Sequence, residues 1–246
     1  MKQSTASRGL GLLLQSLAVI VSILIAFALD AWWAERSLRR DLLDDLVSVT
    51  QELETNVVTL EVEALFHRTA IASIDVLVGR IDDADGAPWL TVPDTVASFA
   101  FVFPPSYEAS ITAVRALISS GGLSRLRDPR LKQILGNFEA QAENIREGEL
   151  GARRLAMEEI VPLFWETPDL ASSFGRAVEY RRRGLENTPL PSRPIQIQNV
   201  AGLKNRLLLR RAWVDSSLRS IEQLRVDLEA ALELLRAADG RRMADE

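Results

Sequence analysis

The chain has 246 residues, a formal net charge of −5, 47% apolar residues and no cysteine. The lack of cysteine excludes disulfides, thiolate metal sites and cysteine nucleophiles, and an acidic chain without a concentrated basic face is not expected to bind nucleic acid. The length is sufficient for one sizeable core and a membrane segment.

The first predicted element is a transmembrane helix over residues 9–33, in which Asp30 is the only charged residue. At about 1.5 Å per residue, about 20 apolar residues cross the roughly 30 Å hydrocarbon layer of a bilayer. Two tryptophans follow, as is typical of the membrane interface, and arginines then return the chain to water. The expected interfacial anchors are Trp32, Trp33, Arg36, Arg39 and Arg40.

This segment predicts three regions: a short tail at residues 1–8, the anchor at residues 9–33, and a water-soluble helical domain at residues 34–246. The alternative is a cleavable signal peptide, since Lys2 and Arg8 precede the apolar run and Ala26-Phe27-Ala28 fits the small-x-small rule for cleavage. The run is longer than the roughly 7 to 15 residues usual for a signal peptide, so we favour a retained anchor.

The orientation of the anchor follows less directly, because basic residues lie on both sides of it. A short N-terminus without acidic residues is easily left in the cytoplasm. We therefore expect a single-pass protein of the inner (cytoplasmic) membrane with a cytoplasmic N-terminus and a periplasmic main domain. The reverse orientation is the alternative.

Small residues recur within the predicted span and share one helix face. They are Ala18, Ser22 and Ala26, with Asp30 continuing the same four-residue step. Small residues at this spacing let two helices approach closely, although alanine and serine are also common in any transmembrane helix. Self-association of the span and ordinary composition both stay open, and Asp30 is either a partner-binding charge or, as we favour, a solvated interfacial residue.

The next predicted element is an amphipathic helix of about 45 residues, continuous with the anchor. Apolar residues step by threes and fours over residues 42–81, a pattern typical of a bundle or coiled coil, and a turn cluster at residues 82–88 ends it. His67 is the only histidine and lies in the same stripe. We expect it to be packed in the bundle rather than to act as a ligand or a base.

Shorter elements are predicted in the middle of the chain. The apolar run at residues 99–103 fits either a short helix or a strand-like piece. A helix from residue 105 or 106 is expected to run through Leu117 and to end at Gly121-Gly122. Asp128-Pro129 combines an N-cap with proline at the first helical position, and so begins a helix that reaches about Trp165.

The C-terminal third is predicted to contain a short helix over residues 167–183, an exposed loop at residues 184–194, and a second long amphipathic helix from Leu203 that ends at Gly240. The fold class is therefore all-α: a transmembrane helix that continues into a long amphipathic helix, packed in an up-down bundle with shorter helices and a long C-terminal helix.

The two long helices carry opposite charges. Ion pairs between them would favour their pairing, although exposed pairs contribute only about 0 to 1 kcal/mol and both faces could simply be solvated. The acidic residues of the first are Asp41, Asp44, Asp45, Glu52, Glu54, Glu61 and Glu63, and the basic residues of the last are Lys204, Arg206, Arg210, Arg211, Arg219 and Arg225.

No catalytic, cofactor-binding or metal-binding residues are predicted. The sequence has no phosphate-binding loop, no nucleophile elbow and no calcium-loop spacing. Adjacent acidic pairs such as Asp44-Asp45 do not converge on a helix, so we expect them to be solvated.

Two stretches together resemble a bacterial single-span membrane protein family of unknown function. They are residues 20–36, IVSILIAFALDAWWAER, and residues 107–138, with a Tyr-Glu start, a Ser-Gly-Gly-Leu turn and an Asp-Pro-Arg-Leu helix start. The resemblance implies a single span and an extracytoplasmic helical domain, with no assigned activity. The chain departs from the family pattern in having Asp30-Ala31-Trp32-Trp33 in place of a Trp-Asn cluster, and a shorter N-terminus.

The function that we expect is a non-catalytic binding or scaffolding module anchored in the bacterial envelope, with the lipid bilayer and either a protein partner or a second copy as its contacts. One alternative is a sensory or ligand-binding bundle that signals through a partner, which a pocket between helices would favour. The other is a membrane-bound enzyme, which a cluster of acidic residues with His67 around a cavity would favour. The sequence does not identify a small-molecule ligand.

Overall fold

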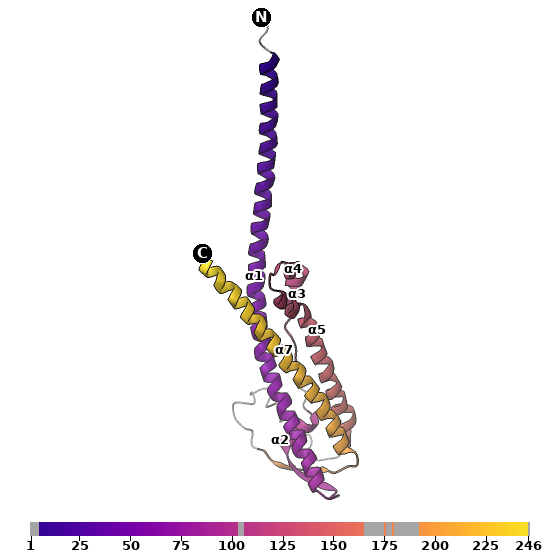
Figure 1. Ribbon diagram of the computed structural model, residues 1–246. Coiled ribbons are helices and arrows are strands. Elements are labelled where there is room, and N and C mark those ends of the chain that lie inside the picture. Colours follow the sequence, from indigo (N-terminus) through magenta and orange to yellow (C-terminus); the bar gives the residue numbers. More distant parts are fainter. Residues whose placement is uncertain (1–4, 103–105, 165–174, 176–178, 180–191, 246) are drawn as a thin grey trace. The chain divides into compact units, whose positions relative to one another are not determined.

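The computed structural model describes residues 5–102, 106–164, 175, 179 and 192–245, except for the side chains of residues 5–16, 18–20, 102 and 238–245. The chain divides into two compact units, residues 1–48 and residues 49–246. Most described residues are helical (Figure 1). The helices are α1 (Thr5–Asp83), α2 (Asp94–Ala97), α3 (Thr112–Ser119), α4 (Gly122–Arg125), α5 (Pro129–Arg154) and α7 (Leu203–Asp245), with π-helices η1 (Ser98–Val102) and η2 (Leu155–Ile160), a 3₁₀-helix η3 (Val161–Phe164) and strands β1 (Trp89–Pro93) and β2 (Pro194–Gln198).

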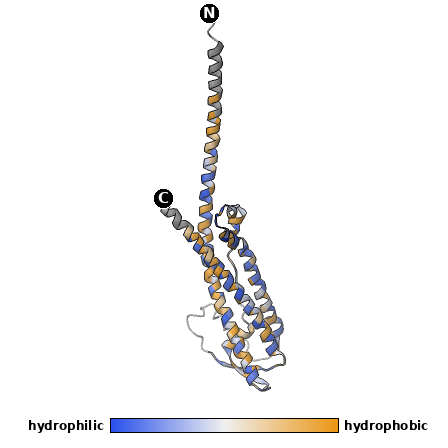
Figure 2. Cartoon of the chain, in the orientation of Figure 1, coloured by the Kyte–Doolittle hydropathy of each residue, from blue (hydrophilic) through white to orange (hydrophobic). Residues whose placement is uncertain are grey.

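Helix α1 joins the predicted anchor and the first amphipathic helix without a break, as the sequence predicts. It ends at Asp83, and Asp85 and Gly86 then take positive φ angles in a turn, which confirms the predicted end. Figure 2 shows a hydrophobic stretch of α1 that is followed by a more hydrophilic one.

No helix within the described residues is long and apolar enough to cross a membrane. The predicted span at residues 9–33 includes residues 9–16 and 18–20, whose side chains lie outside the description. The membrane anchor therefore stays a prediction.

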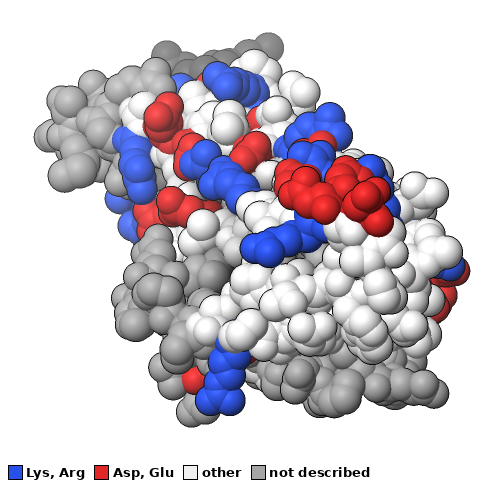
Figure 3. Space-filling model, turned by 90° about the horizontal axis from the view of Figure 1, so that it is seen from below, with Lys and Arg blue, Asp and Glu red and all other residues white. Residues whose placement is uncertain are grey.

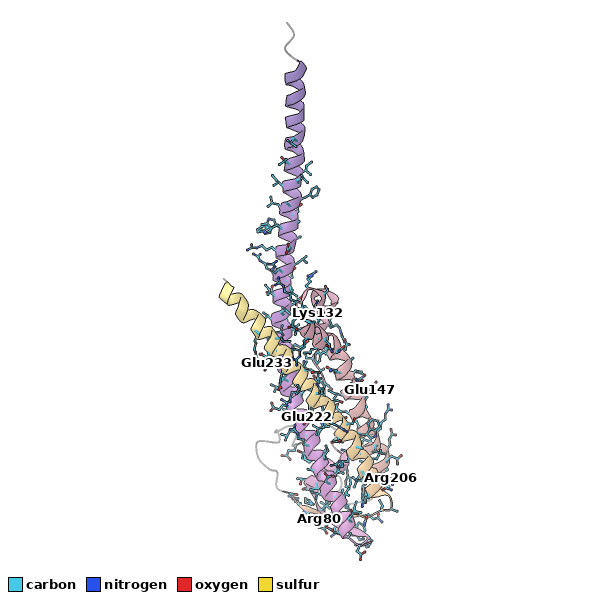
Figure 4. The ribbon with its side chains drawn as sticks, in the orientation of Figure 1. Arg80, Lys132, Glu147, Arg206, Glu222 and Glu233 are labelled. Carbon is cyan, nitrogen blue, oxygen red and sulfur yellow. The ribbon has the colours of Figure 1, made fainter. Side chains whose placement is uncertain are left out.

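In the unit of residues 49–246, ion pairs show that α1 and α7 are antiparallel. Glu54 pairs with Arg236 at 2.7 Å near one end, and Asp82 pairs with Lys204 at 2.5 Å near the other. Between them lie the pairs Arg68–Glu222, with Glu222 labelled in Figure 4, and Asp75–Arg211, both at 2.6 Å. The predicted attraction between the two helices is confirmed, although these exposed pairs favour a register more than they add stability.

Charges of both signs are mixed on the surface as well. On the face drawn in Figure 3, basic and acidic side chains lie next to one another rather than in patches of one sign. The described side chains of this face therefore form no concentrated basic patch.

Helix α5 also runs antiparallel to α7, because Gln141 bonds Asp227 at the middle of α5 and the carbonyl of Ala152 accepts a bond from Arg210 near its end. Two glycines allow close contact between these helices. A Cβ on Gly148 would lie 2.7 Å from Ser217 Oγ, and one on Gly151 would lie 3.2 Å from the Trp213 ring. Both glycines therefore lie inside α5 at places where a larger residue would crowd α7.

Because α1 and α5 both oppose α7, they run in the same direction, which corrects the predicted up-down order. The chain crosses back between them through the non-helical residues 106–111. The helix predicted from residue 105 or 106 begins only at Thr112, since side chains of α1 and α5 bind the backbone of the preceding segment. Residue 105 lies outside the described residues.

Several predicted boundaries are confirmed. The Asp128 carboxylate accepts bonds from the backbone N–H groups of Arg130 and Leu131, at 2.8 and 3.0 Å, and so caps α5. Helical structure continues from α5 through η2 and η3 to Phe164, close to the predicted end. Gly121, with φ of 74°, follows α3 as expected.

Other predictions are wrong or fall outside the described part. Residues 99–102 of the apolar run belong to the π-helix η1, which agrees with the short helix among the two predicted alternatives and not with the strand-like piece. Strands β1 and β2 form an antiparallel pair, Leu90 opposite Ile197, that the all-α prediction lacks. Helix α7 passes through Gly240 to Asp245, since a glycine inside a helix costs only about 1 kcal/mol. The predicted helix at residues 167–183 and most of the loop at residues 184–194 lie outside the description.

The hydrophobic core extends towards both ends of the helical bundle. Near the two-stranded sheet, apolar side chains from α1, η1, η3 and α7 pack together, and Phe101 stacks on Phe164 with ring centroids 4.6 Å apart. Between this cluster and the far end of the bundle lies a group of buried polar side chains, which are the main candidates for chemistry.

Candidate functional site

A buried polar network lies where α1, α5 and α7 meet the segment of residues 106–114. On α1 its members are spaced by four, seven and four residues, which places them on one helix face. All are at least about nine-tenths buried: Glu52, Asn56, Glu63 and His67 on α1, Tyr107 in the crossing segment, Glu149 on α5, and Arg210 on α7.

Among the network residues, Asn56 makes the most of the described hydrogen bonds to residues 106–111, which we call the crossing segment. Its Oδ1 accepts bonds from the Tyr107 hydroxyl at 2.9 Å and from the Ser110 N–H at 3.0 Å. Its Nδ2 donates to the Ser110 carbonyl at 2.7 Å and to the Glu52 carbonyl at 2.8 Å. All the hydrogen-bonding capacity of one buried amide is therefore used inside the protein.

Glu52 caps a helix that lies about 60 residues away in the sequence. Helix α3 has Ile111 at its N-cap and no cap from its own side chains. The Glu52 carboxylate accepts bonds from the backbone N–H groups of Ala113 at 2.8 Å and Val114 at 3.0 Å, and from the Ser110 hydroxyl at 3.2 Å. A carboxylate at a helix N-terminus is also favoured by the helix dipole.

Glu149 connects α5 to the same segment and to α1. Its Oε2 accepts a bond from the Tyr107 N–H at 2.8 Å, and its Oε1 lies 3.6 Å from His67 Nε2. Burial, followed by the negative charges of Glu149 and Glu52, raises the pKa of the Tyr107 phenol, so this hydroxyl stays protonated as the donor to Asn56.

His67 is packed in the bundle, as predicted, and is neutral. Its Nδ1 lies 2.8 Å from the Glu63 carbonyl, which can only accept, so Nδ1 carries the proton. Burial, opposed by the bond to the Glu63 carbonyl and supported by the positive charge of Arg210, lowers the pKa of His67 to about 4. The 3.6 Å contact with Glu149 is beyond hydrogen-bond distance and does not reverse this.

Arg210 is fully buried. It donates to the carbonyls of Phe99 at 3.3 Å and of Ala152 at 3.5 Å. Phe99 lies in η1 and Ala152 in the last turn of α5 before η2, both places where helical hydrogen bonds change register. Burial lowers the pKa of Arg210 to about 10, which leaves the guanidinium charged at neutral pH.

The neutral state of His67 predicts a specific pH dependence of stability. Because its folded pKa is about 4 and its unfolded value 6.5, the unfolded chain binds more protons between these pH values. The stabilisation is therefore fully present above pH 6.5 and is lost as the pH falls towards 4, by about 3 kcal/mol in total. Urea unfolding at a series of pH values measures this loss.

His67→Asn provides the comparison for that measurement. Asparagine has no titration here, and its Nδ2 can donate to the carbonyl four residues earlier, as Asn56 does to Glu52. The wild type should lose about 3 kcal/mol more stability than His67→Asn between pH 7 and pH 4. If the free energy of unfolding fell equally with pH in the two proteins, His67 would not be held neutral.

The residues predicted for the membrane segment belong to the other compact unit, residues 1–48. Trp32 and Trp33 form an edge-to-face pair with centroids 5.5 Å apart, and the Arg36 guanidinium lies 5.4 Å from the Trp32 ring. Arg39 pairs with Glu35 at 3.2 Å. Ser22, Ala26, Asp30 and Arg40 are exposed, and the side chain of Ala18 lies outside the described residues.

Sequence reasoning found His67 but not the network around it. Glu52, Glu63 and Arg210 were assigned to charged helix faces, whereas all three are buried. The available signal was the position of Glu52, Asn56, Glu63 and His67 beside the apolar stripe of α1. A polar residue in that place needs an internal partner.

Among the described residues, no group of three or more His, Asp or Glu side chains is arranged to hold a metal ion. Comparisons with protein-family models, with curated proteins and with solved structures find no match to this chain. The resemblance to a bacterial single-span family therefore stays a prediction.

The hydrogen bonds of the network are best explained by a role in stabilising the fold. Its donors and acceptors bind the backbone of residues 106–114 and the ends of neighbouring helices, and its members are at most 8% exposed. Buried backbone groups outside regular structure need such partners. The network thus holds a non-helical segment against the helices, with Tyr107 as its buried residue.

Proposed function

We propose that the protein is a single-span protein of the bacterial inner membrane, and that its helical domain is a non-catalytic binding or scaffolding module in the envelope. The observation that carries this proposal is the exposure of large apolar side chains on α1. Val21, Ile23, Leu24, Ile25 and Phe27 are between 45 and 67% exposed.

These apolar side chains surround the helix. Residues 23, 24 and 25 follow one another at about 100° around the axis, so no single face could bury them against a neighbouring element. A helix that is apolar all round is normally enclosed by other protein or by lipid. Lipid is the environment that also accounts for the residues that follow.

The region after residue 29 has the composition of a membrane interface. Trp32 and Trp33 are more than half exposed, and Arg36 and Arg39 come within the next two turns. Tryptophan at the headgroup level with arginine beyond it is the usual order at the end of a transmembrane helix. With the N-terminus in the cytoplasm, residues 34–246 would lie in the periplasm.

The buried network favours a non-catalytic role over the enzyme hypothesis. A general acid or base must reach its substrate, whereas His67 and Glu149 are 2 and 3% exposed. Their described hydrogen bonds are to the backbone of the protein itself.

The proposal is tested by expressing the full chain in bacteria and washing the membrane fraction at high pH. The wild type should stay in the membrane pellet. Val21→Arg combined with Leu24→Arg should release the protein, because each arginine near the centre of a span costs about 2.5 to 3.5 kcal/mol. Val226→Arg is the matched control, since Val226 on α7 is 48% exposed and Val21 45%.

Release of the wild type by the wash would contradict the anchor. Sidedness is measured separately with a reporter fused after Glu246 that is active only in the periplasm. A silent reporter on a membrane-bound protein would leave the anchor in place and reverse the orientation.

A further inference from the structure

Helix α1 carries a second stripe, on a face turned away from the buried network. It is built from residues 51–79 at alternating steps of four and three, and it contains no charged residue. Seven of its nine positions are exposed and the other two, Leu65 and Thr69, are half-buried. Val58 is the most exposed of its valines, at 62%.

The stripe is more apolar than its sequence suggests. The hydroxyl of Thr55 donates to the Gln51 carbonyl at 2.9 Å, and that of Thr69 donates to the Leu65 carbonyl at 2.8 Å. Since both hydroxyls are used within the helix, the methyl groups are the parts available to a neighbour. The threonines therefore resemble the valines with which they alternate.

The spacing of the stripe is that of a coiled-coil seam. Steps of four and three give a period of 3.5 residues, with two kinds of core position. One kind is β-branched at every occurrence: Thr55, Val62, Thr69 and Val76. The other kind is Gln51, Val58, Leu65, Ala72 and Gly79. In parallel coiled coils, β-branched residues at the first kind of position, with leucine at the second, favour two strands. Leu65 is the leucine of the second kind here.

We infer that a second copy of this chain covers the stripe, so that residues 51–79 of two copies form a parallel two-stranded coiled coil. A second copy is the partner that matches the stripe by construction, because it presents the same period, the same length and the same uncharged face. The parallel direction rests on the proposed membrane anchor, since two copies inserted in one membrane in the same orientation have parallel α1 helices.

The flanking charges agree with this direction. In a parallel pair each residue just before a β-branched position faces the residue five places later in the other helix. Glu54 then lies nearest Thr59, Arg68 nearest Ser73 and Asp75 nearest Arg80, so no like charges meet. The counterpart of Glu61 is Phe66, which is buried in its own chain. An antiparallel pair centred on Leu65 would bring Glu54 close to Asp75 of the second copy but also Glu61 close to its Arg68, so the direction rests mainly on the anchor.

Single cysteines test the inference directly, because the chain has none of its own. Val58→Cys and Val76→Cys are made separately in the full chain, and membranes that contain each variant are oxidised. Both should give a disulfide-linked dimer, since equivalent core positions of a parallel coiled coil lie side by side. Val226→Cys on α7 is the control, with similar exposure and no expected dimer.

A charged residue at a core position of the coiled coil provides a second test of the inference. Val62→Lys combined with Val58→Cys should reduce the linked dimer at least tenfold, whereas Glu61→Lys, one residue away, should leave most of it. Linkage at a Leu65→Cys position but not at either end would indicate antiparallel helices and overturn the inference.

The outcomes separate this inference from the proposed function. Membrane-bound protein that gives no more dimer for Val58→Cys and Val76→Cys than for Val226→Cys would overturn the coiled coil and leave the anchor unaffected. Protein that washes off the membrane would overturn the anchor. Oxidation of the same variants in solution would then test the coiled coil independently of the anchor.

Discussion

Replacement of Asn56 by leucine is expected to lower the free energy of unfolding by about 3 to 5 kcal/mol. Leucine has a similar volume but cannot bind the Tyr107 hydroxyl or the N–H and carbonyl of Ser110, all of which bond to Asn56. Each buried group left without a partner costs about 1 to 3 kcal/mol. Urea unfolding followed by circular dichroism measures the difference.

Asn137→Leu is the matched control for this prediction. It makes the same exchange at an exposed position of α5, where substitutions usually change stability by less than about 0.5 kcal/mol. If the Asn56 and Asn137 variants were equally stable, the hydrogen bonds to the crossing segment would not contribute to the fold. A variant of Asn56 too unstable to fold would exceed the expected effect in the same direction.

The long helices were predictable because their signals are local. An apolar period near 3.6 without glycine or proline between Gly11 and Gly79 determines α1. Asp128 and Pro129 determine the start of α5, since an N-cap and a first-turn proline act within three residues of each other. The end of α7 was wrong for the opposite reason, because Gly240 is a local stop signal that the longer helix overrides.

The crossing segment was not predictable from local signals. Residues 106–111 were assigned to a helix, but their backbone is bound by Asn56 and Glu149, which are about 40 to 55 residues away. The same holds for the strand pair, whose partners Leu90 and Ile197 are separated by more than 100 residues. Contacts at such distances depend on the fold, and no pattern within one segment contains them.

The positions of the charged residues were likewise predictable only in part. Lys204 and Arg211 do pair with α1, as the opposite charges of the two helices predict, although their partners, Asp82 and Asp75, were not in the predicted set. Arg210, directly beside Arg211, was placed in the same group but points into the core. Net charge along a helix predicts which helices attract, whereas the side on which each residue lies depends on the packing of its neighbours.

Replacement of Arg210 by methionine is expected to cost about 3 to 5 kcal/mol of unfolding free energy, in the range usual for removing one member of a buried charged group. Methionine fills much of the same space but leaves the carbonyls of Phe99 and Ala152 without this donor. It also removes a positive charge that lowers the pKa of His67. Urea unfolding at pH 7 measures the loss of stability.

The effect on His67 distinguishes a charge effect from a packing defect. Without the field of Arg210 the pKa of His67 should rise, so the pH range in which stability falls should move upward in Arg210→Met relative to the wild type. Arg219→Met is the control on the same helix, because Arg219 is 72% exposed and pairs only with its own neighbour Asp215 among the described ion pairs. A stable Arg210→Met protein would mean that the cost of burying the guanidinium outweighs its contacts, which is the known alternative for buried charges.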